Sequence, residues 1–186
     1  MSAIKVAVFT GSLRKASINR RLALAVAALA PQDFVFEPVR IDQLPLYDQD
    51  FDGDYPAEAA ALKRQVEAAD ALLFVTPEYN RSIPGVLKNA LDIGSRPWGT
   101  NSFAGKPGAV IGASIGSTGS ALAQQHLRNV LAYLDVAVLA QPEVFVQFKD
   151  DALIDGEGHV SNEDTRKFLQ GFVDRYAAWV RMHRRA

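Results

Sequence analysis

The chain has 186 residues, of which 48% are hydrophobic and 22% charged, and its formal net charge at pH 7 is -1. These values fit one ordinary globular domain, residues 1–186, and argue against nucleic acid or an anionic membrane surface as the main partner. There is no cysteine, so disulfides, thiol nucleophiles and cysteine-ligated metals are excluded, and any redox chemistry must come from a bound cofactor.

The N-terminus shows no targeting segment. Met1 is followed almost directly by the apolar run Ile4 to Phe9, without a basic region or a small-residue cleavage site, and no later apolar run could span a bilayer. We therefore expect a cytoplasmic protein whose partner is a small molecule.

Short apolar runs alternate with helical patterns along the chain. The runs that predict strands buried on both faces are Ile4 to Phe9, Phe34 to Val39, Ala71 to Val75, Gly108 to Ala113 and Val136 to Leu139. This alternation predicts a doubly wound α/β fold, with a five-stranded parallel sheet in the order 2-1-3-4-5 and helices on both faces. Long connections are expected at Leu44 to Pro56 and at Gln141 to Asn162. Ligands of such sheets bind at the carboxyl ends of the strands, so the loops after the first, third and fourth strands should carry the site.

The loop after the first predicted strand has the composition of a monophosphate-binding site. It contains Ser12, Arg14, Ser17 and Asn19 and leads into a predicted helix. The N–H groups and partial positive charge of a helix N-terminus stabilise an anion, and Arg14 adds a charged donor suited to phosphate. Helix capping or solvation would explain any one of these residues, but the four together favour a phosphate site. The loop matches neither the ATP-type P-loop nor the dinucleotide-binding pattern.

The loop after the third predicted strand is suited to contact the edge of a planar heterocycle. Pro77 and Pro84 keep it rigid, and Pro84 is well placed at the start of a helix. Backbone amides of the residues Glu78 to Asn80 could then face the ring. A plain turn is the alternative, although a plain turn would need neither Tyr79 nor Asn80.

The loop after the fourth predicted strand allows two interpretations. Its small residues, Gly112 to Ser120, let the backbone approach a flat ligand closely. The same stretch contains G-x-S-x-G, in which Ser114 would be the nucleophile of a serine hydrolase. His159, after Asp135 or Asp155, would then supply the base in the right chain order. The hydrolase is the less favoured hypothesis, because the chain is short for that fold and the first loop would be unexplained.

Together these loops resemble those of the NADPH-dependent FMN reductase family, which includes bacterial quinone and chromate reductases with a flavodoxin-like fold. The resemblance covers nearly all of the chain and rests mainly on Gly11 to Asn19 and Pro77 to Ala90. It implies that the chain binds FMN and passes electrons from NADPH or NADH to a small acceptor, such as a quinone, free flavin, a metal oxyanion or a ferric complex. An electron carrier like flavodoxin is a further alternative, but such carriers tend to be strongly acidic.

The resemblance also implies roles for individual residues. The FMN phosphate would be held by Ser12, Arg14, Ser17 and Asn19, and the flavin ring would be surrounded by Pro77, Glu78, Tyr79, Asn80, Ser82, Ser114, Gly116, Ser117 and Gly119. The flavin carries the chemistry, so no general acid or base is expected, and no metal site is expected. His126 and His183 are expected at the surface.

Two further features bear on the acceptor and on assembly. Leu44 to Asp48 is similar to a family segment near the neighbouring subunit's flavin, which implies a homodimer or homotetramer. Family members often have Tyr at position 81 and Gly-Ala-Arg at 120–122, where this chain has Arg81 and the residues Ser120 to Leu122. Arg81 is either a solvated side chain or a group that attracts an anionic acceptor or the NADPH phosphate.

Overall fold

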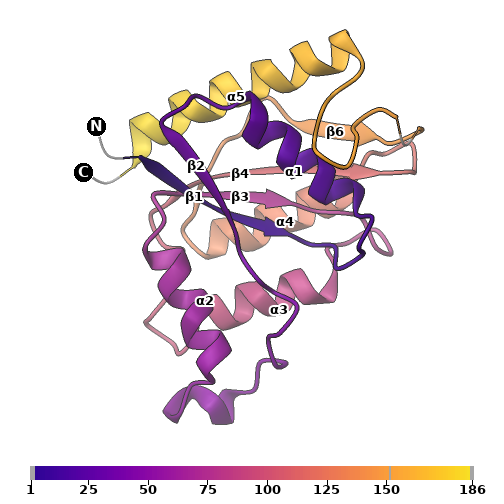
Figure 1. Cartoon of the computed structure of the whole chain (residues 1–186). Helices are drawn as coiled ribbons and strands as arrows, with labels where there is room; N and C mark the ends of the chain where they lie inside the picture. The colour runs from indigo at the N-terminus through magenta and orange to yellow at the C-terminus, as the bar shows by residue number, and fades with distance from the viewer. Residues whose placement is uncertain (1–2, 151, 185–186) are drawn as a thin grey trace.

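A computed structural model describes residues 3–150 and 152–184, and it shows a parallel sheet with helices on both faces (Figure 1). The strands are β1 (Ile4–Thr10), β2 (Phe34–Pro38), β3 (Ala71–Val75), β4 (Pro107–Ser114), β5 (Ala137–Val138) and β6 (Val144–Gln147). Their order is β2-β1-β3-β4-β5, with β6 also pairing with β4, and every pair is parallel. The doubly wound, flavodoxin-like order that the sequence predicts is confirmed.

The edge of the sheet beside β4 differs from the prediction. The predicted strand Val136–Leu139 is present only as the two-residue β5, which pairs with the start of β4, while β6 pairs with the end of β4. β6 lies inside the segment Gln141 to Asn162, which the sequence predicts to be a long connection, so that prediction is wrong for Val144–Gln147. Val144 and Val146 are buried and Phe145 is exposed, and this alternation is too short to be distinctive in the sequence alone.

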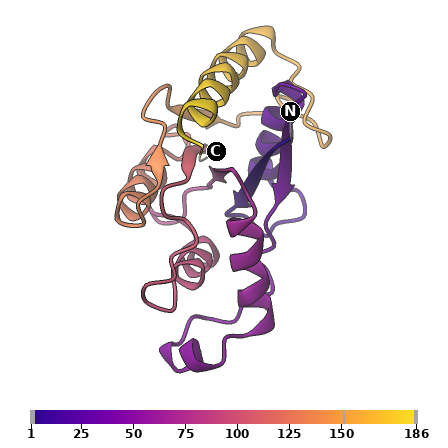
Figure 2. The same cartoon turned by 90° about the vertical axis from the view of Figure 1, so that its left-hand side faces the viewer.

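The helices divide between the two faces of the sheet (Figures 1 and 2). α1 (Ile18–Leu29) and α5 (Glu163–His183) bury their apolar positions in one core layer. α2 (Ala57–Glu67), α3 (Gly85–Gly94) and α4 (Ala121–Tyr133) bury theirs in the other, and a short 3-10 helix, η1 (Gln49–Gly53), precedes α2. Over residues 3–150 and 152–184, none of these helices is both long and apolar enough to cross a bilayer.

Candidate functional site

Three loops meet at the carboxyl ends of the central strands. They are the β1–α1 loop (residues 11–17), the β3–α3 loop (residues 76–84) and the β4–α4 loop (residues 115–120). The N–H of Gly11 donates to Val75 O at 2.9 Å, and an added Cβ at Gly11 would lie 3.1 Å from Pro77 Cδ and 3.3 Å from Leu87 Cδ2. A glycine therefore lets the first loop lie directly against the second.

The β1–α1 loop presents hydrogen-bond donors that have no partner in the protein. Within the described part of the chain, neither Ser12 Oγ, the Arg14 guanidinium nor the backbone N–H groups of residues 12–16 form a hydrogen bond. Ser12 is half-buried and Arg14 is exposed. Unpaired N–H groups beside a helix N-terminus, together with a guanidinium, form the donor set that a phosphate group requires, so the residues present fit the phosphate of an FMN.

The side chains of Ser17 and Asn19 are both used inside the protein. Ser17 Oγ accepts the N–H of Arg20 at 3.2 Å and so caps α1. Asn19 is buried; its Nδ2 donates to Ala113 O at 2.9 Å, and its Oδ1 accepts the N–H of Ala113 at 2.9 Å. The two residues can therefore offer their backbone N–H groups to a ligand while their side chains shape the loop.

The pairing of Asn19 follows from where β3 ends. Ile111 O accepts the N–H of Thr76 at 3.0 Å, so Ile111 faces the β3 side of β4, and Ala113, two residues later, faces the same side. There β3 has already ended at Val75, so no residue of that strand lies opposite Ala113. The amide of Asn19 replaces the missing strand residue, and nothing in the local sequence signals it.

The β3–α3 loop ends in a tight turn with a strained backbone. The N–H of Tyr79 donates to Ser82 O at 2.9 Å, and the N–H of Ser82 donates to Tyr79 O at 3.0 Å. The two central residues, Asn80 and Arg81, have φ values of 51° and 64°, the left-handed region that Asn tolerates better than Arg. Tyr79, Asn80 and Arg81 are all exposed at the tip. Such conformations are concentrated at functional sites, so the turn is a candidate ligand contact.

Glu78 joins the β3–α3 loop to α4. Its Oε2 accepts the N–H of Leu122 at 3.0 Å and the N–H of Ala123 at 3.3 Å, in the first turn of the helix. The residue before the helix, Ser120, has a φ of 75° and forms no side-chain cap. Glu78 is therefore the cap of α4, a role that sequence reasoning missed because the two partners are 44 and 45 residues away.

A second contact joins the same loop and helix. His126 Nδ1 lies 3.0 Å from Ser82 Oγ, on the exposed side of α4. The prediction that His126 lies at the surface is confirmed, but the residue also has a specific partner in the predicted flavin site. The N-terminal half of α4 thus holds both ends of the β3–α3 turn.

The β4–α4 loop is exposed along residues 115–118 and lies close to its neighbours at two glycines. An added Cβ at Gly112, just before the loop, would collide with Thr76 O and Ser120 Oγ, and one at Gly119 would lie 2.8 Å from the carbonyl carbon of Phe145. Gly119 also has a φ of +55°. Small residues are required here by the packing of the backbone itself.

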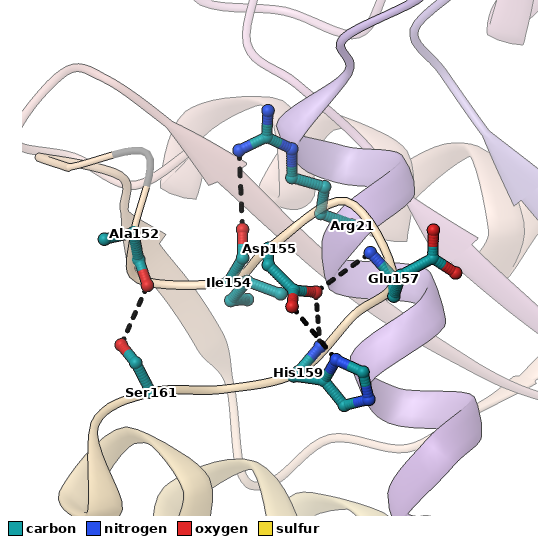
Figure 3. Close-up of polar contacts among 7 residues, drawn as sticks. All are labelled: Arg21, Ala152, Ile154, Asp155, Glu157, His159 and Ser161. Atoms are coloured by element: carbon teal, nitrogen blue, oxygen red, sulfur yellow. Dashed lines mark hydrogen bonds and ion pairs between the residues drawn. The ribbon is translucent and has the colours of Figure 1, made fainter.

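The hydrolase hypothesis can be tested on the positions of its proposed residues. Ser114 Oγ accepts the N–H of Gly116 at 3.1 Å. His159 Nδ1 lies 2.9 Å from Asp155 Oδ2, but both belong to a hairpin over α1, in which an added Cβ at Gly158 would lie 2.7 Å from Leu24 Cβ (Figure 3). Among the described residues no hydrogen bond links His159 to Ser114.

The Asp155–His159 pair therefore stabilises its own turn. The N–H groups of Glu157 and His159 both donate to Asp155 Oδ1 at 2.9 Å. The hydrogen bond from the His159 backbone is the main reason that the pKa of Asp155 lies below its ordinary value. The His159 side chain is 79% exposed, so it is not enclosed in a site.

Comparisons with known proteins point to one family. The sequence matches the family described as NADPH-dependent FMN reductase over residues 4–151. It is 58% identical over 182 residues to a 2-hydroxy-1,4-benzoquinone reductase from a Burkholderia species, covering 98% of this chain and 99% of the relative. It is 44% identical over 180 residues to a quinone reductase from Pseudomonas putida, covering 96% of each. The solved structure of FerB, a flavoenzyme NAD(P)H:(acceptor) oxidoreductase from Paracoccus denitrificans, matches with a TM-score of 0.94 at 44% identity, covering 98% of this chain and 100% of that one.

Proposed function

Because the chain belongs to the NADPH-dependent FMN reductase family, we propose that its FMN lies across the three loops at the ends of β1, β3 and β4. The chain is an FMN-dependent NAD(P)H oxidoreductase that passes electrons to small acceptors. The observation that carries the placement is the set of unpaired donors in the β1–α1 loop, which no group of the described chain uses.

The phosphate of FMN is assigned to the β1–α1 loop. Ser12 and Arg14 would bind it with their side chains. Ser17 and Asn19 would bind it with backbone N–H groups, because the side chains of these two residues already form hydrogen bonds within the protein. The guanidinium of Arg14 suits a phosphate better than an ammonium group would, because it can donate two parallel hydrogen bonds.

The flavin ring is assigned to the other two loops. Pro77 to Asn80 would face the ring through the backbone, since the Glu78 carboxylate is already bound to α4. The other ring contacts of this proposal are Ser82, Ser114, Gly116, Ser117 and Gly119. When bound, FMN accepts a hydride from NAD(P)H and delivers electrons to the acceptor. The residues around it position the ring and supply donors where negative charge develops.

The acceptor is proposed to be a small benzoquinone. The Burkholderia relative, at 58% identity, is named for reduction of 2-hydroxy-1,4-benzoquinone. Arg81 is exposed at the tip of the β3–α3 turn and forms no ion pair within the described residues, so it is available to attract an acceptor with an acidic hydroxyl.

A spectrum and an assay test this function. The purified protein should be yellow, its heat-released flavin should be FMN and not FAD, and it should oxidise NAD(P)H with a benzoquinone in steady state. An electron carrier would not do so without a partner reductase. Colourless protein that fails to bind added FMN would contradict the proposal.

Self-association is proposed through the segment Leu44 to Asp54. Asn89 holds this segment on α3, donating from Nδ2 to Pro45 O at 2.8 Å and accepting the N–H of Tyr47 at 2.8 Å. Leu46 is 82% exposed, and Trp98 is 75% exposed, so large apolar side chains face solvent in the isolated subunit. We expect a dimer or tetramer; sedimentation that shows a fully active monomer at micromolar concentration would contradict it.

A further inference from the structure

A groove with a volume of about 410 Å³ lies between the β1–α1 loop, α1 and the end of β2. Its wall includes Leu24 from α1 and Phe36 from β2, which are partly exposed apolar side chains. The volume is in the range of small-molecule sites, and an apolar wall with a few polar groups is typical of them.

The rim of this groove carries uncompensated positive charge. Arg14, Lys15, Arg20 and Arg40 line it, with Asp42 as the one acidic residue among its lining residues. Arg40 is neutralised by Asp42, because its Nη2 lies 2.8 Å from Asp42 Oδ2 and its Nε lies 3.2 Å from Oδ1. The side chains of Arg14, Lys15 and Arg20 form no ion pair or hydrogen bond within the described ranges, and Lys15 and Arg20 remain uncompensated when Arg14 binds the FMN phosphate. In a chain with a net charge of -1, this local excess favours a ligand that is itself an anion.

We propose that this groove binds the adenosine 2′-phosphate end of NADPH and makes the enzyme prefer NADPH to NADH. The proposal rests on the proposed function, since it assumes FMN at the same loop. Ser12, Arg14 and Lys15 line the groove, and this loop also carries the donors assigned to the FMN phosphate. We assign the adenosine end of the dinucleotide to this groove because the groove shares the β1–α1 loop with the proposed site of the FMN phosphate.

The charge and shape of the groove match what distinguishes NADPH from NADH. The two cosubstrates differ only in the 2′-phosphate, so discrimination requires positive groups near that position. Lys15 and Arg20 are exposed and form no ion pair with any described residue, and they line the groove together with the apolar wall on which an adenine could pack. Arg20 belongs to none of the residues assigned to FMN.

The test uses the FMN-loaded enzyme and the variants Arg20→Gln and Lys15→Gln, with Arg64→Gln on α2 as the matched control. Steady-state kcat/KM is measured for NADPH and for NADH with a benzoquinone, and 2′,5′-ADP and 5′-ADP are titrated calorimetrically. Each groove variant should lower kcat/KM for NADPH about tenfold to a hundredfold, the effect of losing one charged hydrogen bond, mainly by raising KM. The value for NADH should change less than about twofold.

The binding arm gives a readout that is independent of turnover. Wild-type enzyme should bind 2′,5′-ADP more tightly than 5′-ADP, the groove variants should lose that difference, and the control should keep it. If a yellow, active variant kept the wild-type ratio of kcat/KM for NADPH to kcat/KM for NADH, the assignment of the groove would be refuted and the proposed function would stand. Equal affinity of the wild type for 2′,5′-ADP and 5′-ADP would have the same meaning. A wild-type protein without FMN or without NAD(P)H oxidation would instead refute the proposed function.

Discussion

Glu78 Oε2 lies 3.0 Å from the backbone nitrogen of Leu122, so the loop that follows β3 caps the helix that follows β4. The carboxylate meets the partial positive charge at the N-terminus of α4 and satisfies two N–H groups that have no partner in the helix. The β3–α3 loop and α4 are therefore held as one unit beside the proposed flavin.

Replacing Glu78 should loosen this unit. Glu78→Ala removes the cap, so the free energy of unfolding should fall by about 1–2 kcal/mol and Tm by about 2–8 °C, with weaker FMN binding. Glu78→Gln keeps a hydrogen-bond acceptor, so its free energy of unfolding should fall less than that of Glu78→Ala. Thermal unfolding and FMN titration measure both, and Glu157→Ala, at an exposed loop position, is the control. A loss no greater than that of the control would argue against the cap.

Replacing Asn19 should cost more stability than replacing a surface cap. Asn19→Ala leaves the buried N–H and C=O of Ala113 without partners, at about 1–3 kcal/mol each. Asn162→Ala, which removes the exposed cap of α5, should cost about 0.5–2 kcal/mol. Urea unfolding compares the two. Equal losses would mean that water replaces the amide at Ala113.

Replacing Arg14 should weaken FMN binding and leave the fold intact. The lost charged hydrogen bond costs about 1.5–3 kcal/mol, which raises the dissociation constant of FMN roughly tenfold to a hundredfold. Fluorescence titration of the apoprotein with FMN measures it, with Arg64→Ala as the control. An unchanged dissociation constant would remove Arg14 from the site.

Replacing Ser114 separates the flavin enzyme from a hydrolase. Ser114→Ala loses the acceptor for the Gly116 N–H, a neutral bond worth about 0.5–1.5 kcal/mol, so NAD(P)H oxidation should change by roughly tenfold or less. A nucleophilic serine would instead lose about a millionfold in turnover. A fluorophosphonate probe should leave the wild-type protein unlabelled. Stoichiometric labelling at Ser114, with esterase activity lost in the variant, would favour the hydrolase.

The turn at Asp155 should weaken in acid. Its folded-state pKa lies below the ordinary 3.8, so its contribution to stability is present above pH 3.8 and is lost as the pH falls through the folded-state value. The difference in stability between wild type and Asp155→Asn should be largest near neutral pH and shrink below pH 3.8. Unfolding measured at several pH values tests this; a difference that stays constant into acid would contradict the assignment.

The sequence by itself determined the strand order and the family, and it also singled out the loops to which we assign the site. Ala71–Val75 is predicted to the residue, because a parallel strand buried on both faces is apolar throughout, and that signal lies within five residues. The composition of the loops at residues 11–19 and 77–90 is equally local, and the family match confirms the resemblance that these two segments carry.

Only the tertiary structure decided which side chains form hydrogen bonds within the protein and which remain available to a ligand. Asn19 and Ala113 are 94 residues apart, and they pair because β3 ends before β4 does and leaves a backbone edge to be satisfied. Glu78 is bound to α4 for a similar reason: the N–H groups of the first helical turn have no partner within the helix, and the Glu78 carboxylate is close enough to accept them. Such pairings depend on which backbone groups are left over once the chain has folded, and no pattern of neighbouring residues records that.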